Sequence, residues 1–151
     1  MKRLFWFVLD SLGIGGAPDA EKYGDSGSDT LGHISEWFVK YEGRSLDLPS
    51  LRSLGLGAAY QLVHRHQPMG WSEECVTGTF AAASEISTGK DTPSGHWEMA
   101  GVPVKWEWAY YPDTQESFPS ALLSEIYLQS RLEGSLANCH ASGTVVIEKY
   151  G

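Results

Sequence analysis

Residues 84–101 read S-E-I-S-T-G-K-D-T-P-S-G-H-W-E-M-A-G, which predicts a strand end, a polar turn and then a short helix. Thr92 directly precedes Pro93, and proline is common at the first helical position because its missing N–H costs nothing there. We therefore expect Thr92 to be the N-cap, with its hydroxyl facing the free amides and the positive end of the helix dipole. The same groups would hold a phosphate carried on that hydroxyl. On the local pattern alone, a plain helix cap is the simpler role.

A continuous apolar run, L-F-W-F-V-L, occupies residues 4–9 and ends on Asp10. Such a run is typical of a strand buried on both faces of a parallel sheet. Ligands of open α/β sheets bind at the carboxyl ends of the strands, so Asp10 is a candidate metal ligand. A cap of the following turn is an equal alternative for this residue. Residues 79–85 predict a second core strand, which gives an α/β fold class.

The glycine-rich segment over residues 10–16, D-S-L-G-I-G-G, does not fit a dinucleotide-binding fingerprint. That fingerprint would need a third glycine at position 18, which is Pro18, and no P-loop motif is present. We expect these glycines to let the backbone turn tightly beneath a site.

Further elements follow from caps and spacing. A helix is predicted from a cap at Ser28 or Asp29 to Gly43, and Pro49 begins helical turns that end at a glycine. Residues 57–78 read as irregular.

His64 and His66 lack a third ligand nearby, which favours a solvated segment over a metal site. Residues 102–111 hold alternating aromatic side chains that predict packing. Residues 119–132 and 142–150 predict helices, and residues 136–139 a short strand.

The amino-acid composition limits which binding partners and which cellular compartment we expect for this protein. The 151 residues carry a net charge of −8, from 11 basic and 19 acidic residues, which argues against a nucleic-acid surface. Cys75 and Cys139 have no metal-site spacing, and we interpret them as reduced thiols. The apolar run is too short for a signal peptide or a membrane span, and Asp10 ends it without a cleavage site. We expect a cytoplasmic protein that binds neither membrane nor nucleic acid.

Four stretches together resemble bacterial phosphopentomutases, members of the alkaline-phosphatase superfamily. They are residues 1–34, residues 87–104 with the specific run K-D-T-P-S-G-H-W-E, S-F-P-S-A-L-L at 117–123 and N-C-H-A-S-G-T-V-V-I at 138–147. The resemblance implies interconversion of the 1- and 5-phosphates of ribose or deoxyribose through a phosphothreonine, in nucleoside salvage. It also implies two divalent metal ions, usually manganese, and a sugar bisphosphate activator. On this chain Thr92 matches the phosphorylated nucleophile and a metal contact, and Asp10 matches a metal-binding aspartate.

The resemblance also implies a domain organisation. Residues 1–101 would be the N-terminal part of a phosphatase-like core with a mostly parallel sheet flanked by helices, and residues 102–151 the truncated beginning of an inserted α+β cap domain. The family's remaining metal ligands, in D-H-G and D-H-T-R-E-H motifs, and its substrate-binding residues are expected beyond residue 151. We therefore expect an N-terminal fragment without turnover by itself, whose partner is the missing C-terminal part.

Two alternatives remain at this point. Another phosphomutase of the same superfamily, such as the cofactor-independent phosphoglycerate mutase, also places an aspartate after its first strand. Its nucleophile is a serine, and both Thr92 and the H-W-E run disfavour it. The second alternative is a truncated product that has no catalytic role.

Overall fold

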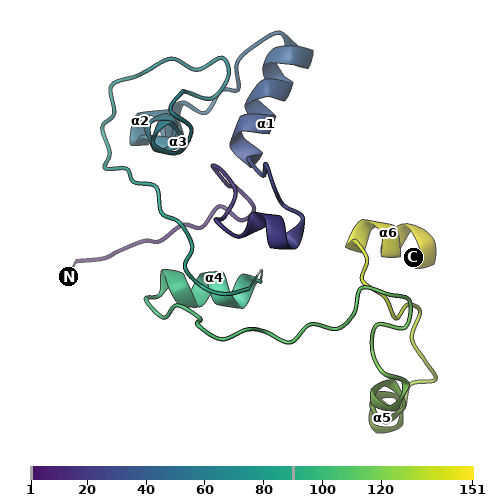
Figure 1. Ribbon diagram of the computed structural model, residues 1–151. Helices are drawn as coiled ribbons and strands as arrows, with labels where there is room; N and C mark the ends of the chain where they lie inside the picture. Colours follow the sequence, from purple (N-terminus) through teal and green to yellow (C-terminus); the bar gives the residue numbers. More distant parts are fainter. Residues whose placement is uncertain (1, 90) are drawn as a thin grey trace. The chain divides into compact units, whose positions relative to one another are not determined.

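The computed structural model describes residues 2–89 and 91–151, and its regular elements are all helices (Figure 1). The chain divides into two compact units, Met1–Lys105 and Trp106–Gly151. The first unit therefore extends four residues past the predicted domain end at residue 101. The roles assigned to the two predicted domains stay predictions.

Within its described residues, the first unit contains four α-helices and two shorter helical turns. They are the 3-10 helix η1 (Ala20–Tyr23), α1 (Thr30–Trp37), the π-helical turn η2 (Phe38–Glu42), α2 (Pro49–Leu54), α3 (Leu56–His64) and α4 (Thr92–Met99). The second unit contains α5 (Ser120–Ser130) and α6 (Gly143–Tyr150). These two helices confirm the predictions over residues 119–132 and 142–150.

Capping residues set the ends of α1 and α2 as predicted. Asp29 is the N-cap of α1, and its carboxylate accepts the Gly32 amide at 3.1 Å. Gly43 ends the helical region at a φ of 64°. Pro49 begins α2, and Gly55 ends it at a φ of 110°, a left-handed conformation that glycine adopts without steric cost.

Helix α3 begins directly after Gly55, so the prediction of an irregular segment over residues 57–78 is wrong for its first part. The buried side of α3 consists of Gly57, Ala59 and Tyr60 rather than large aliphatic side chains. Small residues produce no clear apolar periodicity, which is the signal that sequence reasoning depends on.

The core of the first unit is built on Leu31 of α1, Tyr60 of α3 and Trp71, all of which are buried. Half-buried leucines and Ile14 pack around these three residues. The indole N–H of Trp71 donates to the Leu46 carbonyl at 2.8 Å, so its polar group is satisfied inside the core. This core fixes α1 against α3 and carries the glycine-rich loop, because Ile14 is part of the packing.

The predicted strands have no counterpart among the residues that the structure describes. Residues 4–9 form no regular element, and their side chains are exposed, from 92% for Leu4 to 51% for Leu9. Residues 79–85 and 136–139 likewise lack strand structure. The parallel sheet therefore stays a prediction.

No helix in the described ranges combines the length and apolar character needed to span a membrane.

Asn138 links two segments of the second unit. Its side chain accepts the Phe118 amide at 2.7 Å and donates to the Phe118 carbonyl at 3.0 Å. Its backbone carbonyl accepts the Ser117 amide at 3.0 Å. The Phe118 ring packs against Tyr111, with ring centroids 4.7 Å apart. The segment before α5 is thereby joined to the segment before α6.

Candidate functional site

Thr92 is the first residue of α4, and the N-cap is Asp91. The two carboxylate oxygens of Asp91 accept the backbone amide of Ser94 at 2.8 Å and its hydroxyl at 2.9 Å. The prediction of Thr92 as N-cap is therefore wrong by one residue. The physical reason is that a charged carboxylate is a stronger acceptor than a hydroxyl for the amides of the first turn.

The shift by one residue leaves Thr92 with an exposed side chain at the positive end of the helix. Its backbone carbonyl contacts His96 Nδ1 at 2.8 Å, one turn further along α4. Gly101 closes the other end of the helix at a φ of 90°. Both ends of α4 are thus defined, and Thr92 lies on its N-terminal turn.

The glycine-rich loop lies beside the segment that leads to Thr92. A hollow of about 140 Å³ is lined by Gly15, Gly16 and Ala17 on one side and by Glu85 and Gly89 on another. A second hollow of about 210 Å³ adjoins the same loop and also includes Glu85. The structure therefore brings together the segments that follow Asp10 and precede Thr92. Neither Asp10 nor Thr92 lines these hollows.

Glu85, which lines both hollows, has a carboxyl group with a shifted pKa. Partial burial raises its pKa above the usual range, and repulsion from Glu98, Asp19 and Asp91 adds to the increase. A carboxyl group in this situation gains a proton more easily than a solvated one. The hollow is thus bordered by acidic side chains, so an anion there needs a compensating cation.

Asp10 itself lies in a turn directly after the exposed apolar run, and its side chain is exposed. The Leu12 amide donates to the Leu9 carbonyl at 3.3 Å across this turn, and Ser11 has a φ of 61°. The structure gives no group of three or more His, Cys, Asp or Glu placed to hold a metal ion within residues 2–89 and 91–151. The described residues do not by themselves fit a metal site.

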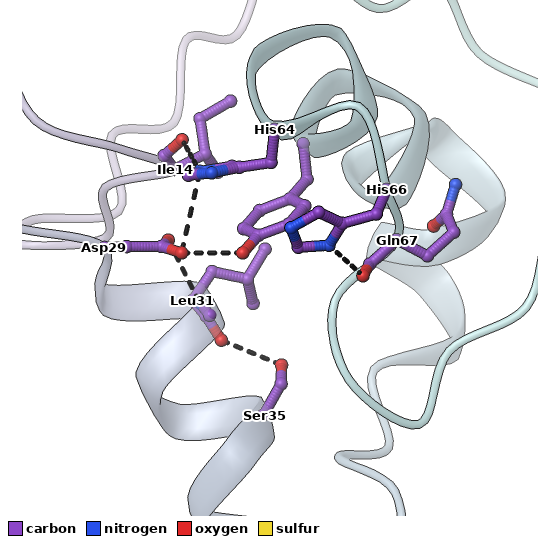
Figure 2. Close-up of polar contacts among 9 residues, drawn as sticks. Ile14, Asp29, Leu31, Ser35, His64, His66 and Gln67 are labelled. Carbon is purple, nitrogen blue, oxygen red and sulfur yellow. Dashed lines mark hydrogen bonds and ion pairs between the residues drawn. The ribbon is translucent and has the colours of Figure 1, made fainter. Parts of the chain in front are cut away.

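A polar network anchors the glycine-rich loop to α1 and α3 (Figure 2). Besides capping α1, Asp29 accepts the Tyr60 hydroxyl at 2.6 Å. His64 Nε2 lies 2.9 Å from the Ile14 carbonyl and 3.5 Å from Asp29 Oδ2. Because a carbonyl only accepts, Nε2 must carry a hydrogen. One histidine thus links the loop, the N-terminus of α1 and the end of α3.

The Tyr60 ring stacks on His64, with centroids 4.1 Å apart. Burial raises the pKa of Tyr60 strongly above its ordinary value, and the hydrogen bond and negative charge of Asp29 act in the same direction. The prediction of a solvated segment at His64 is therefore wrong, whereas His66 is exposed and contacts the Gln67 carbonyl. The polar partners of His64, Asp29 and Ile14, lie 35 and 50 residues away along the chain, so no local pattern could have identified them.

No family model matches the chain. Curated phosphopentomutases match all of it. The protein of Erwinia tasmaniensis is 52% identical over 157 aligned residues, that of Photorhabdus laumondii is 51% identical over 157, and that of Idiomarina loihiensis is 49% identical over 151. Each alignment covers 100% of this chain but only 38–39% of the relative. The chain thus spans about two fifths of the length of the curated relatives that it matches.

The alignments extend through both units, including α4 and the Asn138 region. Identity of about one half along a whole chain leaves no room for a chance likeness of one motif. The resemblance predicted from four separate stretches of sequence is therefore confirmed: over its whole length, this chain is similar to phosphopentomutases.

Proposed function

We propose that this chain supplies the phosphate-carrying threonine of a phosphopentomutase, an isomerase that interconverts the 1- and 5-phosphates of ribose or deoxyribose. The observation that carries the proposal is the 49–52% identity to curated phosphopentomutases along the whole chain. The exposed position of Thr92 on the first turn of α4 supports the same assignment.

Thr92 would transfer phosphate in two steps. In the first step a free hydroxyl of the sugar phosphate loses its proton to solvent and bonds to the phosphorus of the phosphothreonine, while the bond from that phosphorus to Thr92 Oγ breaks and the released oxygen takes up a proton. In the second step the Thr92 hydroxyl gives up its proton and bonds to the other phosphorus of the bisphosphate, and the sugar oxygen released from that phosphorus takes up a proton, which completes the isomerisation. The backbone dipole of α4 favours negative charge near Thr92 in both steps.

Asp91 reduces the contribution of the α4 dipole to holding a phosphate on Thr92. Its carboxylate already lies at the N-terminus of α4, so it reduces the positive potential that a phosphate on Thr92 would experience. Phosphate at Thr92 therefore requires a further positive charge, which agrees with the two divalent ions, manganese by resemblance, expected for this family. Asp10 and Thr92 are the ligands that we propose from this chain, and the other ligands are expected in the part of the relatives that it does not span.

The proposal is tested with a chimera. The complete chain is joined to the portion of the Erwinia tasmaniensis phosphopentomutase that it does not span, and interconversion of ribose 1- and 5-phosphates is measured with manganese and a sugar bisphosphate. We expect turnover, and a loss of at least about 10³-fold in Thr92→Ala because the covalent route is gone. Thr114→Ala, at an exposed threonine outside α4 and outside the predicted strands, is the matched control. A folded chimera without turnover, or a fully active Thr92→Ala variant, would contradict the proposal.

Asp10 is tested separately in the same chimera. We expect Asp10→Asn to raise the manganese concentration needed for half-maximal turnover, because an amide is a weaker ligand than a carboxylate. Asp47→Asn, at another exposed aspartate, serves as the control. An unchanged manganese requirement in Asp10→Asn would remove this residue from the metal ligands.

A further inference from the structure

The carboxylate of Glu98 connects the two sides of Thr92. Glu98 lies near the end of α4, and its Oε1 accepts the Ile86 amide at 2.9 Å while its Oε2 accepts the Ser87 amide at 2.7 Å. Both oxygens are therefore used, and a carboxylate that accepts two backbone amides has little freedom to move. Thr92 lies within the loop that these two hydrogen bonds close.

A second pair of hydrogen bonds extends this connection. The Val104 amide donates to Ser87 Oγ at 3.0 Å, and the Thr88 amide donates to the Val104 carbonyl at 2.8 Å. Ser87 is 7% exposed and Val104 is fully buried, so these contacts are shielded from water. The segment before α4, the helix itself and the segment after it are thus joined at one place.

We propose that Glu98 is a positioning residue that fixes Thr92 by holding residues 86 and 87 against α4. The hydrogen bonds belong to the chain itself, whereas the importance of Thr92 rests on the proposed function. A nucleophile that must approach phosphorus in line loses rate when its backbone can shift, even if its own side chain is unchanged. Glu98 would therefore affect catalysis without touching the substrate.

The protonation of Glu98 agrees with this role. Hydrogen bonding from Ser87 and from the Ile86 backbone lowers the pKa of Glu98 below its ordinary range. A lowered pKa keeps the carboxylate charged, so the two hydrogen bonds persist at neutral pH and weaken only when the pH falls through the lowered value. Glu85 is the neighbouring acid; partial burial raises its pKa, and the negative charges of Glu98, Asp19 and Asp91 add to the increase.

The complete 151-residue chain allows a direct test by NMR. In the unsubstituted protein we expect the amide signals of Ile86 and Ser87 to shift together in acid, as one carboxylate titrates below the usual glutamate range. Glu98→Gln should abolish that shift, speed hydrogen exchange at one or both amides by about tenfold or more, and move the Thr92 amide signal. Glu125→Gln, the same change on α5, should alter none of these signals.

Two results would overturn the proposal. One is a titration of the Ile86 and Ser87 signals below the usual glutamate range that persists in Glu98→Gln, and the other is a Thr92 signal that does not respond to this substitution. If Glu98→Gln does not fold, the acid titration of the unsubstituted chain tests the proposal instead. Ile86 and Ser87 amide signals that titrate only in the ordinary glutamate range, or not at all, would contradict their hydrogen bonds to Glu98.

The chimera separates this proposal from the proposed function. Glu98→Gln is expected to lower kcat by about tenfold to a hundredfold with little change in KM, since substrate contacts remain. An inactive chimera without substitutions counts against the proposed function, while the NMR signals still decide the role of Glu98. An active chimera in which Glu98→Gln has an unchanged kcat overturns the positioning role alone.

Discussion

Asp91 and Thr92 are adjacent in the chain, but the structure assigns them different tasks. Asp91 accepts both polar groups of Ser94 and so fixes the first turn of α4. Thr92 begins the helix with its hydroxyl exposed. Because the cap is a separate residue, the hydroxyl of Thr92 is not required for the helix to form. Substitutions at Thr92 should therefore abolish phosphate transfer and leave the fold intact.

The capping role of Asp91 can be measured in the isolated chain. We expect Asp91→Ala to destabilise α4 by about 1 kcal/mol, because a helix loses this much when a side-chain cap is removed. Faster hydrogen exchange of the α4 amides would report the change. Asp19→Ala is the matched control, since Asp19 precedes η1 without a side-chain cap hydrogen bond. Equal effects of the two substitutions would contradict the capping role.

Tyr60 provides a second test at the scale of a single residue. We expect Tyr60→Phe to lower the free energy of unfolding by about 1–2 kcal/mol, because the Asp29 carboxylate loses the hydrogen bond that it accepts from the Tyr60 hydroxyl at 2.6 Å. Urea denaturation of the complete chain measures this change. Tyr41→Phe, at a tyrosine that is 63% exposed, should alter stability by less than about 0.5 kcal/mol.

The raised pKa of Tyr60 predicts a pH dependence with a defined sign. The folded chain holds the phenolic proton more tightly than the unfolded chain, so the stabilisation is complete below the ordinary tyrosine pKa of about 10. It is lost as the pH rises above that value. The free energy of unfolding should therefore fall more steeply above this pH in the unsubstituted chain than in Tyr60→Phe. Parallel plots of the free energy of unfolding against pH would contradict the hydrogen bond between Tyr60 and Asp29.

At the scale of the helices, two glycines in helix interiors predict opposite effects. An added Cβ at Gly32 of α1 would collide with the Asp29 carboxylate and lie 2.6 Å from the Tyr60 hydroxyl, whereas Gly95 of α4 has nothing within 4 Å. Gly32→Ala should destabilise the chain by about 2 kcal/mol or more through the lost network. Gly95→Ala should stabilise it by about 0.5–1 kcal/mol. Thermal unfolding of both variants measures these changes in stability. A change of the same sign in Gly32→Ala and Gly95→Ala would contradict the packing at Gly32.

Caps and breakers in the sequence predicted some helices well, and tertiary contacts explain what they missed. The carboxylate of Asp29 and the glycines at 43 and 55 act locally, so α1 and α2 could be placed from the sequence. Helix α3 presents Gly57 and Ala59 to the core, and these small residues resemble a loop composition.

The candidate site was predictable to the same extent. Thr92 and Asp10 followed from a motif and from a run of apolar residues, and they stay predictions. Asp91 could have been predicted as the N-cap from the sequence, because aspartate is as good a cap as threonine and Asp91 lies three residues before Ser94. The contact of Glu98 with Ile86 and Ser87 joins residues eleven and twelve apart through a turn, and no spacing rule predicts it.

At the scale of the whole molecule, the exposed apolar run is the feature that most needs explanation. Phe7 is 81% exposed and Trp6 is 62% exposed, which is uncommon for large apolar side chains in a run. We propose that residues 4–9 form the predicted strand of a parallel sheet when the rest of a phosphopentomutase is present. Asp10 would then lie at the carboxyl end of that strand.

Hydrogen exchange tests the strand. We expect the amides of residues 4–9 to exchange rapidly in the isolated chain and at least about 10³-fold more slowly in the chimera, because a central strand pairs and buries its amides. The α1 amides serve as an internal reference that should change far less. Rapid exchange at residues 4–9 in an active chimera would contradict the strand.

Tandem mass spectrometry of the chimera during turnover determines whether Thr92 carries the phosphate. We expect a phosphorylated peptide with the phosphate on Thr92, and the loss of this peptide in Thr92→Ala but not in Thr114→Ala. Turnover with phosphate on another residue, or with no phosphorylated form of the chain at all, would contradict this expectation.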